Sequence, residues 1–181
     1  MSGLKKGSSN FTYVNIRQGQ LVVKKDGVAE SYSSLVGIVR NVNFEEDEFE
    51  GKKFEVAKIL FDCDGQLFLL QMRVDSGYFR GFCNSIKSGN PLEEAEVVPS
   101  YKKGDKGIPQ TTCFINQKGK SLKHFHTKDN MGDLPLLKSM QLKGNTVWDN
   151  SEQIAYWKKW LRSMYDVSIE ETIGDKGDLP F

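Results

Sequence analysis

Apolar and polar residues alternate along the first two thirds of the chain, and this period of two predicts β-strands. The stretch FTYVNIRQGQLVVKK (11–25) predicts two short strands joined by a Gln18-Gly19 turn. Asp26-Gly27 predicts a second tight turn before VAESY. We therefore expect residues 1–32 to form a leader and a small antiparallel β-hairpin or meander.

Three further strands are predicted from Ser33 onward, in SLVGIVRNVNF, KFEVAKILF and QLFLLQMRV. The acidic segment EEDEFEG (45–51) is predicted to be the loop between the first two. Asp64-Gly65 predicts a hairpin turn between the second and the third.

A helix is predicted over YFRGFCNSIKSG, because Tyr78, Phe82 and Ile86 recur at i, i+4 and i+8, which is the spacing of a packing face. Ser76, or the aspartate before it, is expected to cap the N-terminus of this helix. Gly89 is expected to end it.

Two more strands, EEAEVVPSY and TTCFINQ, are separated by the basic loop KKGDKGIPQ. Pro99 has no N–H to donate, so its strand is expected to lie at an edge or to bend there. Lys118-Gly119 predicts a further hairpin turn into KSLKHFHTK.

The order strand–strand–strand–helix–strand–strand over residues 33–127 matches the connectivity of an OB-fold, a five-stranded Greek-key barrel. A β-sandwich or an SH3-like barrel with one inserted helix is the alternative. We expect a mainly β protein in which an N-terminal β-hairpin precedes the barrel and a helical segment (128–166) and an acidic tail (167–181) follow it.

The helical segment is predicted from NTVWDNSEQIAYWKKWLRSMYD, with Asp149, Asn150 or Ser151 as its N-terminal cap. In it, Ile154, Trp157, Leu161 and Met164 form a stripe of period 3.6. We expect this stripe to dock the helix on the barrel. A second interpretation uses Tyr156 and Trp160, which lie i, i+4 beside Lys159, as a platform on which bases stack.

The charge distribution is more informative than the net charge of +1. Residues 101–130 carry seven lysines against two aspartates, whereas residues 166–181 carry five carboxylates against one lysine. Three widely spaced cysteines fit a reducing compartment better than a disulfide framework. The chain has no signal-peptide pattern and no apolar run near the ~20 residues of a membrane span, so we expect a cytoplasmic protein with no membrane contact.

The last four residues are Asp178, Leu179, Pro180 and Phe181, preceded by further carboxylates. This ending resembles that of bacterial single-stranded DNA-binding proteins and of functionally similar phage proteins. Those proteins pair an OB-fold with an acidic C-terminal tail that ends in an acidic residue, an aliphatic residue, proline and phenylalanine. The resemblance implies non-specific binding of single-stranded DNA in replication, recombination or repair, with partner proteins recruited through the tip. The alternative is a tail that folds back on its own domain.

Binding of unpaired nucleotides requires cations along the backbone path and flat rings on which bases stack. In an OB-fold the binding surface is the face of the second and third strands together with the first and fourth loops. Mapped onto this chain, the candidates on that surface or near it are Arg40, Phe49, Lys58, Arg73, Tyr101, Lys102, Lys103, Lys106, Phe114, Lys120, Lys123 and Phe125.

Other functions have weaker support. The acidic loop is interpreted as solvated charge and not as a metal site, Asp62-Cys63-Asp64-Gly65 as a hairpin turn and not as a calcium loop, and His124 and His126 as surface or packing residues and not as zinc ligands. Walker and dinucleotide-binding glycine motifs are absent from the sequence. We therefore expect neither an enzyme nor a bound cofactor. The open alternative is an OB-like protein-interaction module with no nucleic-acid role, and either function is compatible with a homo-oligomer.

Overall fold

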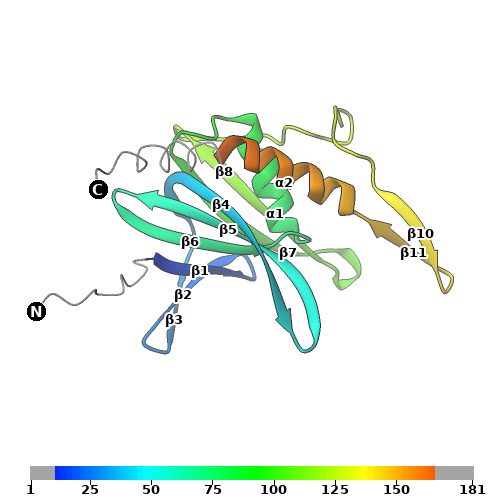
Figure 1. Cartoon of the computed structure of the whole chain (residues 1–181), viewed down its shortest axis with the longest axis horizontal. Helices are drawn as coiled ribbons and strands as arrows, with labels where there is room; N and C mark the ends of the chain where they lie inside the picture. The colour runs from blue at the N-terminus through cyan, green and yellow to red at the C-terminus, as the bar shows by residue number, and fades with distance from the viewer. Residues whose placement is uncertain (1–10, 166–181) are drawn as a thin grey trace, which may run out of the picture.

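Nine β-strands form one mixed sheet that curls around a hydrophobic core, with both α-helices packed on its inner side (Figure 1). The computed structural model describes residues 11–165. The chain is mainly β, as the hydrophobic pattern predicts. In chain order the elements are β1 (Phe11–Arg17), β2 (Gln20–Lys25), β3 (Val28–Tyr32), β4 (Leu35–Phe49), β5 (Lys52–Cys63), β6 (Gln66–Arg73), α1 (Gly77–Ser88), β7 (Ala95–Lys103), a short 3-10 turn (Asp105–Gly107), β8 (Pro109–Gln117), β9 (Lys120–Ser121), β10 (Lys138–Leu142), β11 (Asn145–Asp149) and α2 (Ser151–Tyr165).

Strands β1, β2 and β3 form the antiparallel meander expected from the two Gly-containing turns. The meander is not a separate hairpin, because β1 also pairs in parallel with β6, where Tyr13 lies opposite Leu69. The sheet order is therefore β3–β2–β1–β6–β5–β4–β7–β8–β9. This parallel pairing places the N-terminal meander beside β6.

Strand β4 is longer than predicted, and the sheet bends along it as its partner changes from β7 to β5. Its first residues pair with β7, and from Ile38 onward it pairs with β5, with a bulge at Arg40. The predicted acidic loop over 45–51 is wrong, because β4 continues to Phe49 and only Glu50 and Gly51 form the turn. Lysines on β5 face the carboxylates of β4, as in the Lys53–Glu46 ion pair at 3.3 Å, and this cross-strand pairing favours the extended form.

Helix α1 has the predicted caps, and its bounds lie within one residue of the predicted ones. The Ser76 hydroxyl accepts a hydrogen bond from the backbone N–H of Phe79 at 3.2 Å, and the Gly89 N–H bonds back to the carbonyl of Ile86. Gly81 faces β8, where a Cβ atom would lie only 2.7 Å from the backbone nitrogen of Cys113. The absent side chain at this position is what allows the helix to lie close against the strand.

The hydrophobic core lies between the inner face of the sheet and the two helices. Phe61 of β5 meets Phe82 of α1 edge to face, with ring centroids 6.5 Å apart. Trp157 and Leu161 of α2 are completely or almost completely buried in the same core. Within the described residues, neither helix has the length and apolar character that a bilayer crossing requires.

The C-terminal region differs from the prediction in two respects. NTVWD, which the prediction counted with the helical segment, forms strand β11 and pairs with β10 in a hairpin that projects from the body. Helix α2 begins at Ser151, within the predicted cap positions 149–151, and the Asp149 carboxylate accepts a hydrogen bond from the Ser151 N–H at 2.9 Å. The buried positions of α2 are Gln153, Trp157, Leu161 and Tyr165, one every four residues. Met164, which the predicted stripe included, is exposed.

We expect Gly81→Ala to lower the free energy of unfolding by about 1–3 kcal/mol, the usual cost of overpacking. Alanine is intrinsically the better helix former by about 1 kcal/mol, but the new Cβ would meet β8 backbone, which cannot move aside cheaply. Urea unfolding measures the difference. Arg80→Ala, at the exposed neighbouring position of α1, is the control and should change stability by less than about 0.5 kcal/mol. A Gly81→Ala protein as stable as the wild type would contradict the close packing.

Candidate nucleic-acid interface

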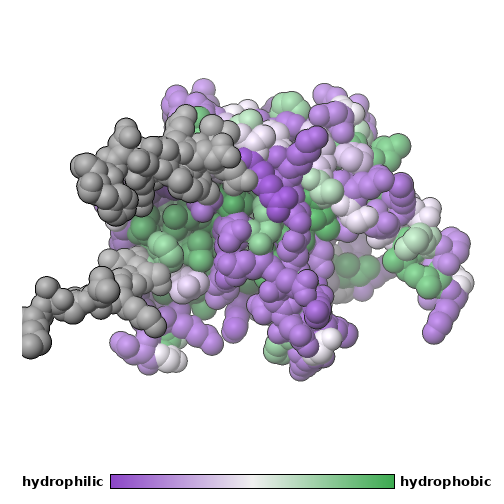
Figure 2. Space-filling model, in the orientation of Figure 1, coloured by the Kyte–Doolittle hydropathy of each residue, from purple (hydrophilic) through white to green (hydrophobic). Residues whose placement is uncertain are grey.

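One face of strands β1, β6 and β5 points away from the core, and its side chains form rows across the strands. Tyr13, Leu69 and Leu60 make one row, and Phe11 and Leu67 begin the next. The Tyr13 side chain is 49% exposed, and the leucines are half-buried. Figure 2 shows hydrophobic residues at the surface in the part of the molecule where Figure 1 places β4, β5 and β6. An exposed apolar patch of this kind on a sheet is typical of a binding surface.

A polar row lies directly beside the apolar rows. Asn15, Gln71 and Lys58 stand opposite one another on the three strands. The Gln71 amide nitrogen lies 3.5 Å from the Asn15 amide oxygen, and the Lys58 amine is paired with Glu45 of β4. Amide groups donate and accept hydrogen bonds, so this row offers partners to base edges and sugars next to a surface on which rings can stack.

A groove of about 390 Å³ continues the polar row toward the start of α1. Its walls include Asn15, Gln71, Phe54 and Arg73. The Arg73 guanidinium lies 4.8 Å from the centre of the Phe54 ring and makes two hydrogen bonds to Asp75, at 3.0 and 2.7 Å. These hydrogen bonds raise the pKa of Arg73. The groove thus combines a flat ring, two amides and an arginine whose charge is balanced by Asp75, and Asp47 adds a carboxylate to its lining.

The lysine-rich end of the β7–β8 hairpin is a separate source of positive charge. Lys102, Lys103 and Lys106 are exposed, and none of them takes part in an ion pair within residues 11–165. The β1–β2 turn contacts this hairpin, since a Cβ at Gly19 would lie 2.7 Å from the backbone nitrogen of Tyr101. The β1–β2 turn therefore lies next to the hairpin that carries these lysines.

The structure brings Lys58 and Arg73 onto the predicted strand face, but each has a carboxylate partner. Arg40 lies at the bulge of β4 and pairs with Asp62 at 3.2 Å. Phe49, at the tip of the β4–β5 hairpin, is 67% exposed. The cations predicted on these strands are therefore largely neutralised.

The remaining predicted residues do not join that face. Phe114 is exposed on β8, opposite Val98 of β7, and Lys120 lies in the short edge strand β9. Lys123 and Phe125 follow it and lie against the last turn of α1, where the Ser88 hydroxyl donates to the carbonyl of Lys123. Asp178, Leu179, Pro180 and Phe181 lie outside the described residues.

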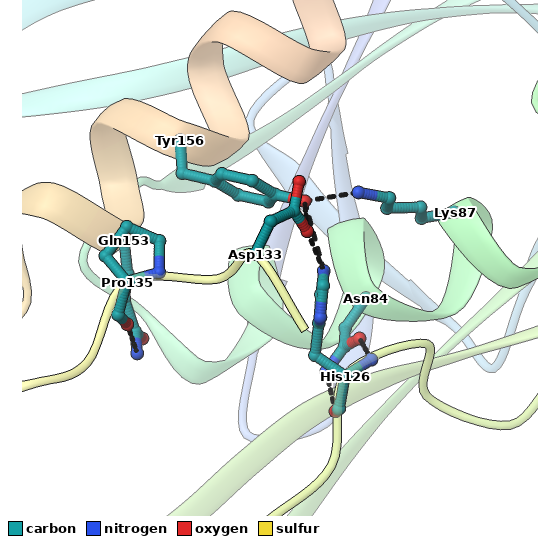
Figure 3. Close-up of polar contacts among 7 residues, drawn as sticks. All are labelled: Asn84, Lys87, His126, Asp133, Pro135, Gln153 and Tyr156. Carbon is teal, nitrogen blue, oxygen red and sulfur yellow. Dashed lines mark hydrogen bonds and ion pairs between the residues drawn. The ribbon is translucent and has the colours of Figure 1, made fainter. Parts of the chain in front are cut away.

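A second cluster of rings and polar groups joins α1, α2 and the segment that precedes β10 (Figure 3). The Asn84 side chain makes two hydrogen bonds to the backbone of His126, at 2.7 and 2.8 Å. The Tyr156 hydroxyl donates to Asp133 at 2.9 Å, lies 3.1 Å from Nε2 of His126 and accepts from Lys87. These contacts fix the segment to both helices.

The cluster shifts the pKa values of its members in opposite directions. Burial and the Asp133 carboxylate raise the pKa of Tyr156 to about 12. Burial and the nearby Lys87 amine lower the pKa of His126. Both Tyr156 and His126 are therefore uncharged at neutral pH.

The residues that sequence reasoning missed are those of β1 and its partner, above all Phe11, Tyr13, Asn15 and Gln71. The alternation in FTYVN already places the first three of them on one face. Their grouping with Gln71 and the outward residues of β5 depends on the parallel β1–β6 pairing, which no local pattern indicates. Within residues 11–165, no group of three or more His, Cys, Asp or Glu side chains is arranged to hold a metal ion, and Cys63, Cys83 and Cys113 are free thiols.

Comparison with known proteins adds no family, because no family model, curated protein or solved structure matches this chain.

The sequence contains only two histidines, so NMR can follow each of them separately. We expect both to titrate below pH 6.5, His126 because of burial and Lys87, and His124 because of burial and Arg80. A lowered histidine pKa means that the unfolded chain binds more protons below pH 6.5, so stability should fall as the pH drops through that range. Lys87→Met should raise the His126 midpoint alone, and Arg80→Met the His124 midpoint alone. A His126 midpoint at or above 6.5 would contradict the geometry of the cluster.

Proposed function

We propose that this protein binds single-stranded DNA without sequence specificity, in the course of replication, recombination or repair. The observation that carries the proposal is the outward face of β1, β6 and β5. On this face aromatic rings and a row of amides lie side by side, and the β1–β2 turn contacts the hairpin that carries the exposed lysines. Sequence-independent binders of single strands combine these two ingredients, flat rings for the bases and cations for the backbone.

We also propose that β4, β5, β6, α1, β7 and β8 form an OB-like barrel within the mainly β fold. Their order along the chain, with α1 between the third and fourth strands, supports it. So does the antiparallel pairing of β4 with both β5 and β7. On this assignment β5 and β6 are the second and third strands, whose face binds oligonucleotides in OB-folds. Strand β1 pairs with the edge of β6 that does not contact β5, and so widens that face.

Each part of the face has its own task in this proposal. Tyr13 and Phe11 stack on bases, and each stacked base contributes about 1–3 kcal/mol. Asn15 and Gln71 bond to base edges or sugars. The lysines at the β7–β8 turn neutralise phosphates, and they do so without first breaking an ion pair within the described residues.

The C-terminal tip, residues 178–181, completes the proposal as the segment that recruits replication or repair proteins. Its sequence supports this role, because a terminal phenylalanine can fill an apolar pocket on a partner while Asp178 and the α-carboxylate meet basic side chains at the rim. This role requires no catalytic group and no cofactor. The reducing cytoplasm is the proposed compartment.

A protein-interaction module with no nucleic-acid role is the second candidate, and the β10–β11 hairpin favours it. Every residue of this hairpin except Asp149 is exposed, including the apolar Met140, Val147 and Trp148. An isolated two-stranded hairpin is at best marginally stable in water, so a protein partner would stabilise it. Titration with oligo(dT) separates the two candidates, because the interaction module predicts no binding.

We expect the triple substitution of Lys102, Lys103 and Lys106 by glutamine to weaken oligo(dT) binding at least tenfold at low salt. The slope of log K against log salt should become shallower by about 2, since each phosphate contact on a single strand contributes about 0.7. Fluorescence anisotropy of a labelled oligonucleotide over a range of salt concentrations measures both quantities. Glutamine at Lys24, Lys25 and Lys143 changes the net charge equally at exposed positions of two other hairpins and should leave the slope near that of the wild type. Equal effects of the two triple variants would remove the β7–β8 turn from the interface.

We expect Tyr13→Ala to weaken oligo(dT) binding five- to a hundredfold, the range that corresponds to the loss of one stacked base. Tyr32→Ala is the matched control, because Tyr32 is 44% exposed but lies on the inner side of the sheet, opposite Leu21 of β2. Its affinity should equal that of the wild type. If Tyr13→Ala binds as tightly as the control, the outward face of β1 does not contact bases.

A further inference from the structure

A pocket between α1 and α2 takes no part in the sheet face described above. Its volume is about 390 Å³, and it is lined by residues of both helices together with Asp133. Trp160 supplies a large half-buried ring, while Lys87 and Lys159 supply two amines. A ring beside two cations is the combination that a nucleotide requires, one surface for the base and two charges for its phosphate.

Lys87 occupies an unusual position in this pocket. Its amine lies 4.8 Å from the ring centres of Phe125 and Tyr156, and 5.7 Å from that of Trp160. The same amine donates to the Tyr156 hydroxyl, which donates in turn to Asp133 (Figure 3). Rings and hydrogen bond together hold the cation in one place, so little side-chain entropy remains to be lost when an anion binds.

The walls of the pocket are fixed as well. The Gln153 side chain donates to the carbonyl of Pro135 at 2.8 Å, and Asn84 clamps the backbone of His126. These bonds tie the segment that carries Phe125 and Asp133 to the two helices (Figure 3). A preformed site binds more tightly than one that must be ordered first.

The one carboxylate in the lining, Asp133, already accepts a hydrogen bond from the Tyr156 hydroxyl, which offsets part of its repulsion of phosphate. Lys159 is exposed and has no ion-pair partner within residues 11–165, so it remains available to a ligand. Lys123, which lies against the same turn of α1, adds positive charge nearby.

We propose that this pocket binds one nucleotide of the single strand, with the base stacked on Trp160 and a phosphate held by Lys87 and Lys159. The inference rests on the proposed function and adds a second contact, made by the helices and not by the sheet. It gives the i, i+4 pair Tyr156 and Trp160 separate tasks: Tyr156 orients Lys87, and Trp160 carries the base. A single strand that contacts both surfaces passes from the face of β1 and β6 to the end of α1.

The first test uses tryptophan fluorescence of the full chain. Trp148→Phe removes the tryptophan of the β10–β11 hairpin, which is 62% exposed, and leaves Trp160 with the buried Trp157. Saturating oligo(dT) should quench the emission of this variant. The quenching should disappear when Trp160→Phe is added, because Trp157 is out of reach of a base.

The second test measures affinity by anisotropy with labelled oligo(dT). Lys159→Gln should weaken binding three- to tenfold and Trp160→Leu at least fivefold, whereas the matched controls Lys143→Gln and Trp148→Leu on the β10–β11 hairpin should bind like the wild type. If the wild type binds oligo(dT) while Trp160 emission and the affinity of Lys159→Gln stay unchanged, the pocket proposal is wrong and the proposed function stands. If the wild type does not bind oligo(dT) at all, both are wrong.

Discussion

Parallel pairing between β1 and β6 is the constraint on which the candidate interface depends. Its register sets Tyr13 against Leu69 and Asn15 against Gln71, so that the rings and amides of a non-adjacent strand continue the rows of β6 and β5. Side chains alternate along a strand, and a slip of one residue would exchange the outward Tyr13 for the buried Val14. The same pairing carries the β1–β2 turn to Tyr101. One non-local contact therefore determines both the composition of the face and its continuity with the lysine-rich turn.

Charge on this protein is divided into paired and unpaired groups, which the net charge of +1 conceals. On the strands, Arg40, Lys58 and Arg73 each have a carboxylate partner close by. Exposed pairs of this kind add little stability, and a phosphate can exchange with the carboxylate at modest cost. At the β7–β8 turn the cations have no such partner within the described residues. In the proposed binding mode, attraction of the nucleic acid begins at this turn, and the rings of the sheet face make contacts at short range.

Local signals predicted the local features of the fold. The Asp64-Gly65 turn, the Ser76 cap and the end of α1 at Gly89 all follow from residue chemistry within a few positions. The acidic segment 45–51 was predicted wrongly because its extended form depends on lysines of the next strand. Strand β11 was counted with the predicted helical segment because its five residues carry no breaker before Asp149. The start of α2 was predicted from its cap residues at 149–151. The predicted cations lie on or near the expected strands and loops. Their ion pairs and the position of β1 beside β6 depend on contacts between residues far apart in the sequence, so local patterns could not predict them.

The α1–α2 cluster shows how buried polar groups define a surface several residues away. Asn84 and Gln153 are buried, and their side chains form hydrogen bonds to the backbone of the segment that carries Phe125 and Asp133. With a pKa of about 12, Tyr156 keeps its proton throughout the physiological range, so it can accept from Lys87 and donate to Asp133 at once. His126 on the same hydroxyl is uncharged at neutral pH and gains a proton only in acid. Protonation would place a second cation beside Lys87 in a buried site, which weakens the packing there while adding attraction for phosphate. As the pH falls from neutral, we therefore expect a change in this cluster to come from protonation of His126 and not from Tyr156.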